Sequence, residues 1–179
     1  MTEPAQQLGP QYKFPPLFYK GVVFGLEPLS DCYPEFLVLA AREWEEVGNN
    51  ERYGEYAPDL ELGLQYEAAG AFFLFTLREQ DTMELVGYFL ITVAPSLKQK
   101  GRTVAQESAM YLTPEAKKGR PWMMAKFLKF LEKAFATFGI HTLEVGHHPD
   151  DNGWRAGKFY ERQGYTPAAA TYIKVLEDA

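Results

Sequence analysis

The feature that most constrains the fold of this chain is an amphipathic segment at residues 121–138, which is predicted to be a helix. Its apolar residues recur three or four positions apart, so a helix would gather them into one stripe and leave charged residues on the other face. The stripe consists of Met124, Phe127, Leu128, Leu131, Phe135 and Phe138, and Lys126, Lys129, Glu132 and Lys133 lie opposite. Such a helix must bury its stripe against a second apolar layer.

Strand-like segments can supply that layer. Residues 71–78 and 84–94 are rich in Phe, Leu, Val, Tyr and Ile and flank a hairpin-like turn. Further strands are predicted at 22–26, 103–112, 140–146 and 171–176, and further helices at 30–47, 59–69 and 152–163, with Ser30 and Asp31 as N-cap candidates. The order β-α-α-β-β-β-α-β-α-β predicts an α/β (α+β) fold, a mixed sheet with helices on its faces.

Length and composition narrow the function. Residues 1–16 contain four prolines and are expected to form an irregular arm, and residues 17–179 a single domain. With Cys32 as the only cysteine there is no internal disulfide, and no apolar run has the length of a membrane span, so we expect a soluble, cytoplasmic protein. The formal net charge of −6 argues against nucleic-acid binding.

One basic cluster stands out in this acidic chain and suggests a small anionic ligand. It consists of Lys117, Lys118, Arg120, Lys126, Lys129 and Lys133. Pro121 suits the first position of the 121–138 helix, whose leading backbone amides have no partner within the helix and carry the positive end of its dipole. Amides around residues 118–123, with these cations beside them, would suit a pyrophosphate. An ordinary strand–helix loop with solvated charges remains the alternative.

Two runs in this part of the chain resemble motifs of the GNAT acetyltransferases. YLTPEAKKGRPWMMAKFLKFLEKAFATFGI (residues 111–140) resembles motif A, in which a strand leads through R/Q-x-x-G-x-G/A into a long helix. NGWRAGKFYERQGY (152–165) resembles motif B, with Ala156, Tyr160, Gly164 and Tyr165 at its spacing. The likeness is nearest to acetyltransferase-like proteins encoded by bacteriophages. It covers most of residues 20–177 and implies a mostly antiparallel central sheet flanked by helices.

The resemblance also implies a cosubstrate, acetyl-CoA. Pantetheine and the oxyanion would contact the backbone at Met110, Tyr111 and Leu112. The pyrophosphate would lie at Lys117, Lys118, Gly119, Arg120, Trp122 and Met123. Arg120 and Trp122 stand where the motif prefers glycine or alanine, so the Trp122 indole could either stack on the cosubstrate or fill its groove.

Tyr160 matches the motif B tyrosine that commonly protonates the leaving thiolate, and Glu107 lies on the strand where these enzymes often place a general base. A core aromatic and a solvated strand carboxylate are the respective alternatives. His147 and His148 beside Asp150 and Asp151 would point to opposite faces of a strand, which disfavours a metal site. Cys32, at the start of an amphipathic helix, is expected to lie in the core.

Two functions follow from these residues. The first is an N-acetyltransferase that moves an acetyl group from acetyl-CoA to an amine, on a small molecule or a protein lysine, by direct attack in a ternary complex. The second is a phage protein of the same fold with weakened catalysis that binds and modulates a host partner in the host cytoplasm. The aromatic residues Tyr12, Phe14, Phe18 and Tyr19 are expected to be exposed and would contribute to such an interface. A homodimer is plausible by analogy with the family.

Overall fold

The computed structural model describes residues 13–120, 122–146 and 153–168, and its described strands form one six-stranded sheet between two layers of helices. The strands are β1 (Leu17–Tyr19), β2 (Val22–Glu27), β3 (Phe72–Glu79), β4 (Leu85–Pro95), β5 (Thr103–Leu112) and β6 (Thr142–Glu144). They lie in the sheet in sequence order, antiparallel except for the parallel pair β5–β6. The predicted strand at 171–176 falls outside the described residues.

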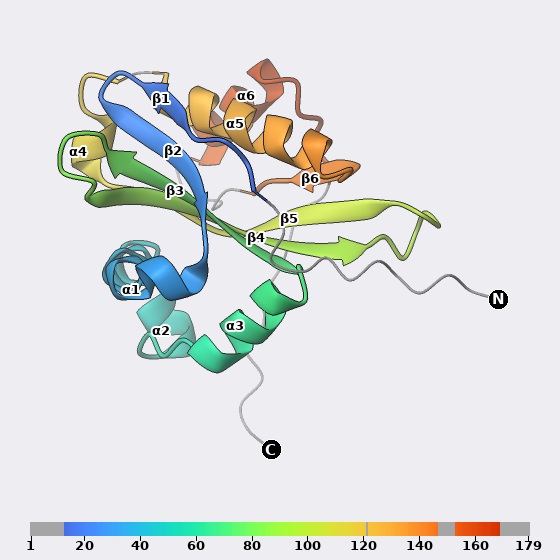
Figure 1. The fold of residues 1–179 in the computed structure, drawn as a ribbon, viewed down its shortest axis with the longest axis horizontal. Helices are drawn as coiled ribbons and strands as arrows, with labels where there is room; N and C mark the ends of the chain where they lie inside the picture. Colours follow the sequence, from blue (N-terminus) through green and yellow to red (C-terminus); the bar gives the residue numbers. More distant parts are fainter. Residues whose placement is uncertain (1–12, 121, 147–152, 169–179) are drawn as a thin grey trace.

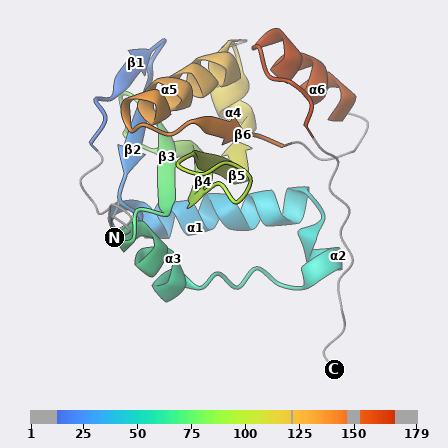
Figure 2. The same cartoon turned by 90° about the vertical axis from the view of Figure 1, so that its right-hand side faces the viewer.

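Helices cover both faces of the sheet (Figure 1). They are α1 (Leu29–Glu46), α2 (Asn49–Tyr53), α3 (Leu60–Ala68), α4 (Pro114–Lys117), α5 (Met123–Thr137) and α6 (Gly153–Arg162). Figure 2, turned by 90°, shows α5 and α6 on one side of the sheet and α1 to α3 on the other. The fold is therefore the predicted mixed α/β arrangement, with a short additional strand, β1, and two short additional helices, α2 and α4.

Each face of the sheet has its own apolar core. The stripe of α5 packs on β2 to β5, where Phe127 is fully buried and its ring centroid lies 5.1 Å from that of Phe24 and 4.8 Å from that of Phe89. On the other face, α1 packs Phe36 against Tyr88, with ring centroids 5.0 Å apart. Cys32 is fully buried in this second core, as predicted.

The start of α1 differs from the prediction. Its N-cap is Pro28 rather than Ser30 or Asp31, and no side chain at the cap position bonds to the first turn. Instead the amide of Leu29 donates to the Glu67 carboxylate, 2.7 Å away on α3. A neighbouring helix thus satisfies a donor that the local sequence leaves open.

No helix among the described residues is long and apolar enough to cross a membrane.

Candidate active site between strands β5 and β6

The two strands β5 and β6 pair over a short distance and then part. Their register runs only from Val104 opposite Thr142 to Gln106 opposite Glu144. Beyond this point β5 continues to Leu112, paired with β4 alone in the described part of the sheet. The second half of β5 therefore has an open backbone edge.

Alternation along β5 identifies the groups on that edge. The amide of Thr113, directly after β5, donates to the carbonyl of Val86 on the β4 side. Because successive residues of a strand direct their backbone groups to opposite edges, those of Met110 and Leu112 point away from β4. These backbone positions belong to the segment 110–112 that the resemblance assigns to pantetheine.

A β-bulge lies where the strands part. Leu90 of β4 faces Ala109, but the next residue, Ile91, faces Glu107, so Ser108 is an additional residue on β5. The Ser108 hydroxyl lies 3.2 Å from that of Thr92 on β4. A bulge bends its strand and increases the local twist, which turns the end of β5 away from a straight neighbour.

Glu107 is half-buried and lies directly beside the bulge. Its Oε2 accepts a hydrogen bond from the amide of Gly146, at 3.1 Å. Burial raises the pKa of this carboxyl to about 7, the charge of Glu43 acts in the same direction, and the bond from Gly146 opposes them. A carboxylate with this pKa can accept a proton near neutral pH.

Tyr160 of α6 also forms a hydrogen bond to the backbone of Gly146. Its hydroxyl donates to the carbonyl of Gly146 at 3.1 Å, while its ring is buried beside Phe159 and Tyr165. Burial, followed by the charge of Glu107, raises the pKa of Tyr160 above its ordinary value, so the phenol keeps its proton. Glu107 and Tyr160 are thus brought together at Gly146, a residue that motif reasoning did not select.

The side chains of residues 110–112 belong to the cores. Tyr111 is buried against the α1 layer and its hydroxyl donates to Glu46 at 2.7 Å. Leu112 is buried and Met110 partly buried on the α5 side. The part of this segment that lies open to a ligand is therefore mainly its backbone.

In the loop before α5, fewer backbone amides lack a hydrogen-bond partner than the sequence predicted. Within residues 118–123, the amides of Lys118, Arg120 and Met123 donate to backbone carbonyls. The amides of Gly119 and Trp122 donate to no other described residue. Gly119 has φ +72°, which favours glycine, and open space where a Cβ would stand.

The basic side chains differ in what they contact. Arg120 forms a two-pronged ion pair with Glu79 at 2.5 and 2.8 Å, which ties the loop to β3. The Lys126 ammonium lies 5.5 Å from the Tyr19 ring centroid. Lys117 and Lys118 are exposed and pair with no described carboxylate. Lys117 and Lys118 are therefore available to bind an anion.

The two predicted ligand-binding residues at the start of α5, Trp122 and Met123, differ in their exposure. Trp122 caps the helix with 62% of its surface exposed, whereas Met123 is 1% exposed and belongs to the core. Pro121, predicted to be the first helical residue, lies outside the described residues, and α5 begins at Met123.

The remaining predictions concern a metal site and the aromatic residues near the N-terminus. Among the described residues no group of three His, Cys, Asp or Glu side chains could hold a metal ion, and His147, His148, Asp150 and Asp151 lie outside that part of the chain. Phe14, expected to be exposed, packs edge-on against Phe130 and Phe138, so that expectation is wrong. Phe18 is exposed, and Tyr12 lies outside the described residues.

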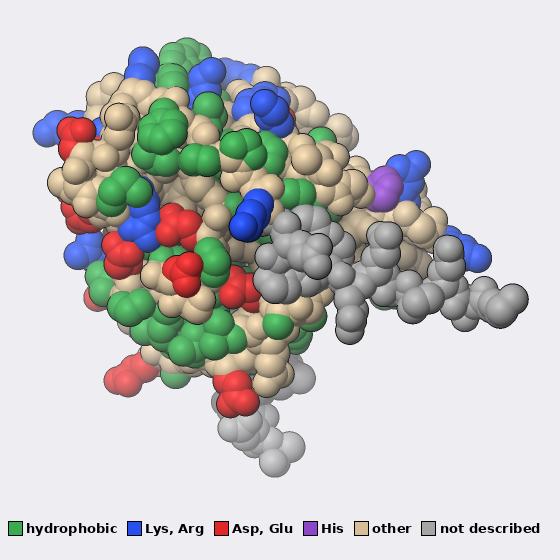
Figure 3. All heavy atoms as spheres, in the orientation of Figure 1, with side chains coloured by type: hydrophobic (Ala, Val, Ile, Leu, Met, Phe, Trp, Pro, Cys, Tyr) green, Lys and Arg blue, Asp and Glu red, His purple; other side chains and the backbone are tan. Residues whose placement is uncertain are grey.

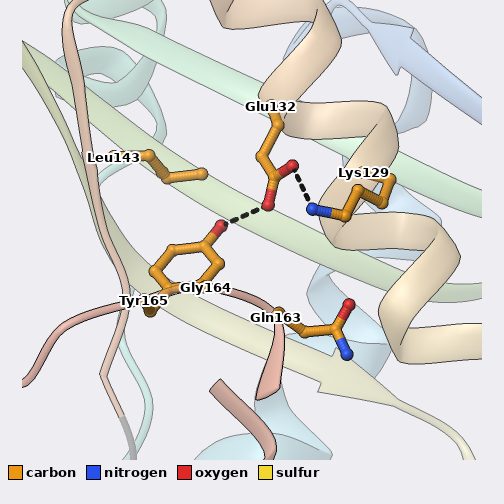
Figure 4. A pocket seen from close by; sticks show the side chains of 6 residues that line it. All are labelled: Lys129, Glu132, Leu143, Gln163, Gly164 and Tyr165. Carbon is orange, nitrogen blue, oxygen red and sulfur yellow. Dashed lines mark hydrogen bonds and ion pairs between the residues drawn. The ribbon is translucent and has the colours of Figure 1, made fainter. Parts of the chain in front are cut away.

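A separate surface pocket of about 330 Å³ lies between α5, β6 and the end of α6 (Figure 4). Three of its polar side chains contact one another: Tyr165 donates to Glu132 at 3.1 Å, and Glu132 pairs with Lys129 at 2.8 Å. These side chains are already satisfied, so we do not assign the pocket to the reaction.

Comparisons with solved structures identify the fold. An aminoglycoside acetyltransferase from an uncultured soil metagenomic sample superposes with a TM-score of 0.70 at 13% identity, over 88% of this chain and 100% of that one. For the ribosomal-protein-alanine N-acetyltransferase of Brucella melitensis the TM-score is 0.62 at 17% identity, over 87% and 99%. AAC(6')-Iy, solved with the bisubstrate analogue CoA-S-monomethyl-acetylneamine, gives 0.61 at 11% identity, over 88% and 100%.

No family model and no curated protein matches the sequence. The likeness to these solved structures nevertheless extends over most of the chain and nearly the whole of each neighbour. The chain has the fold of the GNAT acetyltransferases.

Proposed function

We propose that this chain is an N-acetyltransferase that moves an acetyl group from acetyl-CoA to an amine. The observation that carries the proposal is the position of Glu107 where β5 and β6 part, beside a bulge, with a pKa of about 7. Three structural neighbours are acetyltransferases, and one of them binds a CoA bisubstrate analogue, which supports the same chemistry.

The cosubstrate would use the open edge of β5. Its pantetheine arm would run along the backbone of residues 110–112, and the amides of Met110 and Leu112 would donate to the oxygen that becomes negative during attack. The pyrophosphate would approach the head of α5, where Lys117, Lys118 and the amide of Gly119 are unpaired among the described residues. The exposed Trp122 indole would flank this end of the ligand.

The reaction would proceed by direct attack in a ternary complex. Glu107 takes a proton from the acceptor ammonium, and the neutral amine forms a bond to the thioester carbonyl carbon. The C–S bond then breaks as Tyr160 supplies a proton to the departing thiolate, and the extra proton on the attacking nitrogen passes to the Tyr160 phenolate, which restores the phenol. The products are an acetylated amine and free CoA.

Thermal unfolding with and without acetyl-CoA tests the first part of this proposal. Cosubstrate at 100 times its Kd stabilises the folded state by about 2.7 kcal/mol, which raises Tm by roughly 5–10 °C for a chain of this size. CoA release in the presence of an amine, followed with a thiol reagent, tests turnover. An unchanged Tm at millimolar acetyl-CoA would contradict the enzyme assignment and favour the partner-binding alternative.

A further inference from the structure

Gly87 of β4 lies opposite the end of β5 that the proposed cosubstrate would use. It is buried, and the strand register pairs it with Leu112 and pairs the next residue, Tyr88, with Tyr111. A Cβ added at Gly87 would overlap Cδ2 of Leu112 and would lie 2.9 Å from the carbonyl oxygen of Tyr111. Cβ atoms essentially never make contacts below 3.0 Å, so a larger residue fits here only if its neighbours move.

The atoms that such a Cβ would meet have little freedom to move within the core. Leu112 is 2% exposed and packs in the core on the α5 side, and the carbonyl oxygen of Tyr111 belongs to the backbone itself. Directly after β5, the amide of Thr113 donates to the carbonyl of Val86 at 3.0 Å, which holds the two strands together. A larger residue at position 87 would therefore push the end of β5 away from β4, toward its open edge.

A second contact holds the same segment from the α1 side. The Tyr111 hydroxyl donates to Oε1 of Glu46 in the last turn of α1, 2.7 Å away, and the Tyr111 ring centroid lies 6.5 Å from that of Tyr88. Burial, followed by the hydrogen bond to Glu46, raises the pKa of Tyr111 to about 12. The phenol therefore keeps the proton that it donates.

Glu46 belongs to the acidic side of the molecule. Acidic side chains gather over the lower part of Figure 3, where α1 to α3 lie in Figure 1. Among the described residues, the Glu46 carboxylate forms no ion pair, and Tyr111 is its one hydrogen-bond partner. Because no described cation competes for this carboxylate, the hydroxyl of Tyr111 fixes β5 to α1 at this point.

We propose that Gly87 and the Tyr111–Glu46 hydrogen bond position the open edge of β5 for the cosubstrate. Gly87 lets β5 lie close to β4, and Glu46 holds Tyr111 from α1. This inference rests on the proposed function, because the backbone groups of Met110 and Leu112, on either side of Tyr111, are those that would bind pantetheine and the reacting oxygen. Donors to such an oxygen must lie about 2.7–3.1 Å from it, so a small displacement of this backbone is enough to weaken them.

Gly87→Ala tests the close approach of the two strands, and Gly25→Ala is the matched control. Gly25 is a glycine of β2 whose added Cβ would lie 3.1 Å from Oγ1 of Thr76, and β3 and β4 separate it from β5. Both substitutions add volume in a tight place, and we expect Tm to fall by about 2–10 °C in each. With acetyl-CoA as the varied substrate, well below Tm, kcat/KM should fall about 10- to 100-fold in Gly87→Ala and by less than about twofold in Gly25→Ala. Equal kcat/KM in the two variants would overturn the role of Gly87.

Variants of Tyr111 and Glu46 test the contact with α1 without adding volume to the core. Tyr111→Phe keeps the ring and Glu46→Leu keeps the helix, but both remove the hydrogen bond, so kcat/KM for acetyl-CoA should fall about 10-fold in each. Glu46→Gln keeps an oxygen that can accept from Tyr111 and should stay within about twofold of the natural protein. An unaltered kcat/KM in Tyr111→Phe, or an equal loss in Glu46→Gln and Glu46→Leu, would remove this hydrogen bond from the proposal.

Calorimetric titration with CoA separates this inference from acetyl transfer. CoA binding that Gly87→Ala weakens and Gly25→Ala does not, in a protein that releases no CoA from acetyl-CoA, would support the positioning role and contradict acetyl transfer. Turnover by the natural protein, with equal kcat/KM in Gly87→Ala and Gly25→Ala, would support acetyl transfer and contradict the positioning role. A natural protein with neither CoA binding nor turnover would contradict both.

Discussion

The two edges of β5 show how one strand serves both stability and chemistry. Toward β4 it is paired from Thr103 to Leu112, and the sheet there packs the fully buried rings of Phe24 and Phe89 against Phe127 of α5. Toward β6 it is paired only as far as Gln106, and beyond this point Glu107 and Tyr160 each form a hydrogen bond to Gly146. The packed side supplies rigidity, and the open side leaves backbone groups for a ligand.

Phe127→Ala tests the packed side and should have the largest effect. Removal of a fully buried phenyl ring between Phe24 and Phe89 leaves a cavity, and we expect the free energy of unfolding to fall by about 3–5 kcal/mol. Chemical denaturation measures this loss. Lys133→Ala, on the exposed face of α5, is the matched control and should change stability by less than about 0.5 kcal/mol. Equal losses in both variants would show that α5 is not anchored by its stripe.

Glu107→Gln tests the open side, where the effect should fall on turnover. The amide keeps the size of the side chain but cannot accept a proton, so we expect kcat to fall about 100-fold or more at pH 8. In the natural protein kcat/KM should fall about tenfold per unit as pH drops below about 7, since the carboxylate is then protonated. A Glu107→Gln enzyme with the same rate and pH profile would exclude this base.

The carboxyl of Glu107 should also make the free energy of unfolding depend on pH. Its pKa in the folded chain lies above the ordinary value of 4.5, so the folded state binds this proton more tightly than the unfolded state. The contribution of Glu107 to the free energy of unfolding should therefore decrease as pH rises from about 4.5 to about 7. Denaturation of Glu107→Gln across this range should lack that decrease.

Tyr160→Phe is expected to have the smallest effect. It tests a residue that belongs both to the packed core and to the open side of β5. The ring remains in the core, and loss of the bond to Gly146 should lower stability by about 1 kcal/mol. Turnover should fall about 10-fold, because a thiolate is a good leaving group that needs little help from an acid. Parallel measurements of Tm and kcat check both effects, and an unaltered kcat would remove the proposed acid.

Regular elements were predictable where periodicity was strong. The stripe from Met124 to Phe135 predicted α5, and the bounds of β5 agree with the alternation at 103–112. The helix predicted at 59–69 is also present as α3, and the Asp59 carboxylate caps it by accepting a hydrogen bond from the amide of Leu62. These features depend on residues close in sequence, so local patterns carry them.

The candidate site was predictable only in part. Motif spacing selected Tyr160, and position on the 103–112 strand selected Glu107, yet their meeting at Gly146 depends on the bulge at Ser108 and on the docking of α6. No local pattern marks a bulge, since Ser108 is an ordinary strand residue until β4 sets its register. The loop cations were likewise read as one group, whereas Arg120 is engaged by Glu79, 41 positions away in sequence.

Sequence alone therefore determined the order of the longer described helices and strands, the presence of helices on the faces of the sheet and the kind of loop that precedes α5, because side-chain periodicity and turn residues act over a few positions. Tertiary structure decided where β5 and β6 part, which charges remain unpaired and how far the pKa of Glu107 rises. Those properties arise from burial and from neighbours that are distant along the chain, such as Glu43, and they exist only after the sheet and its two helical layers have packed.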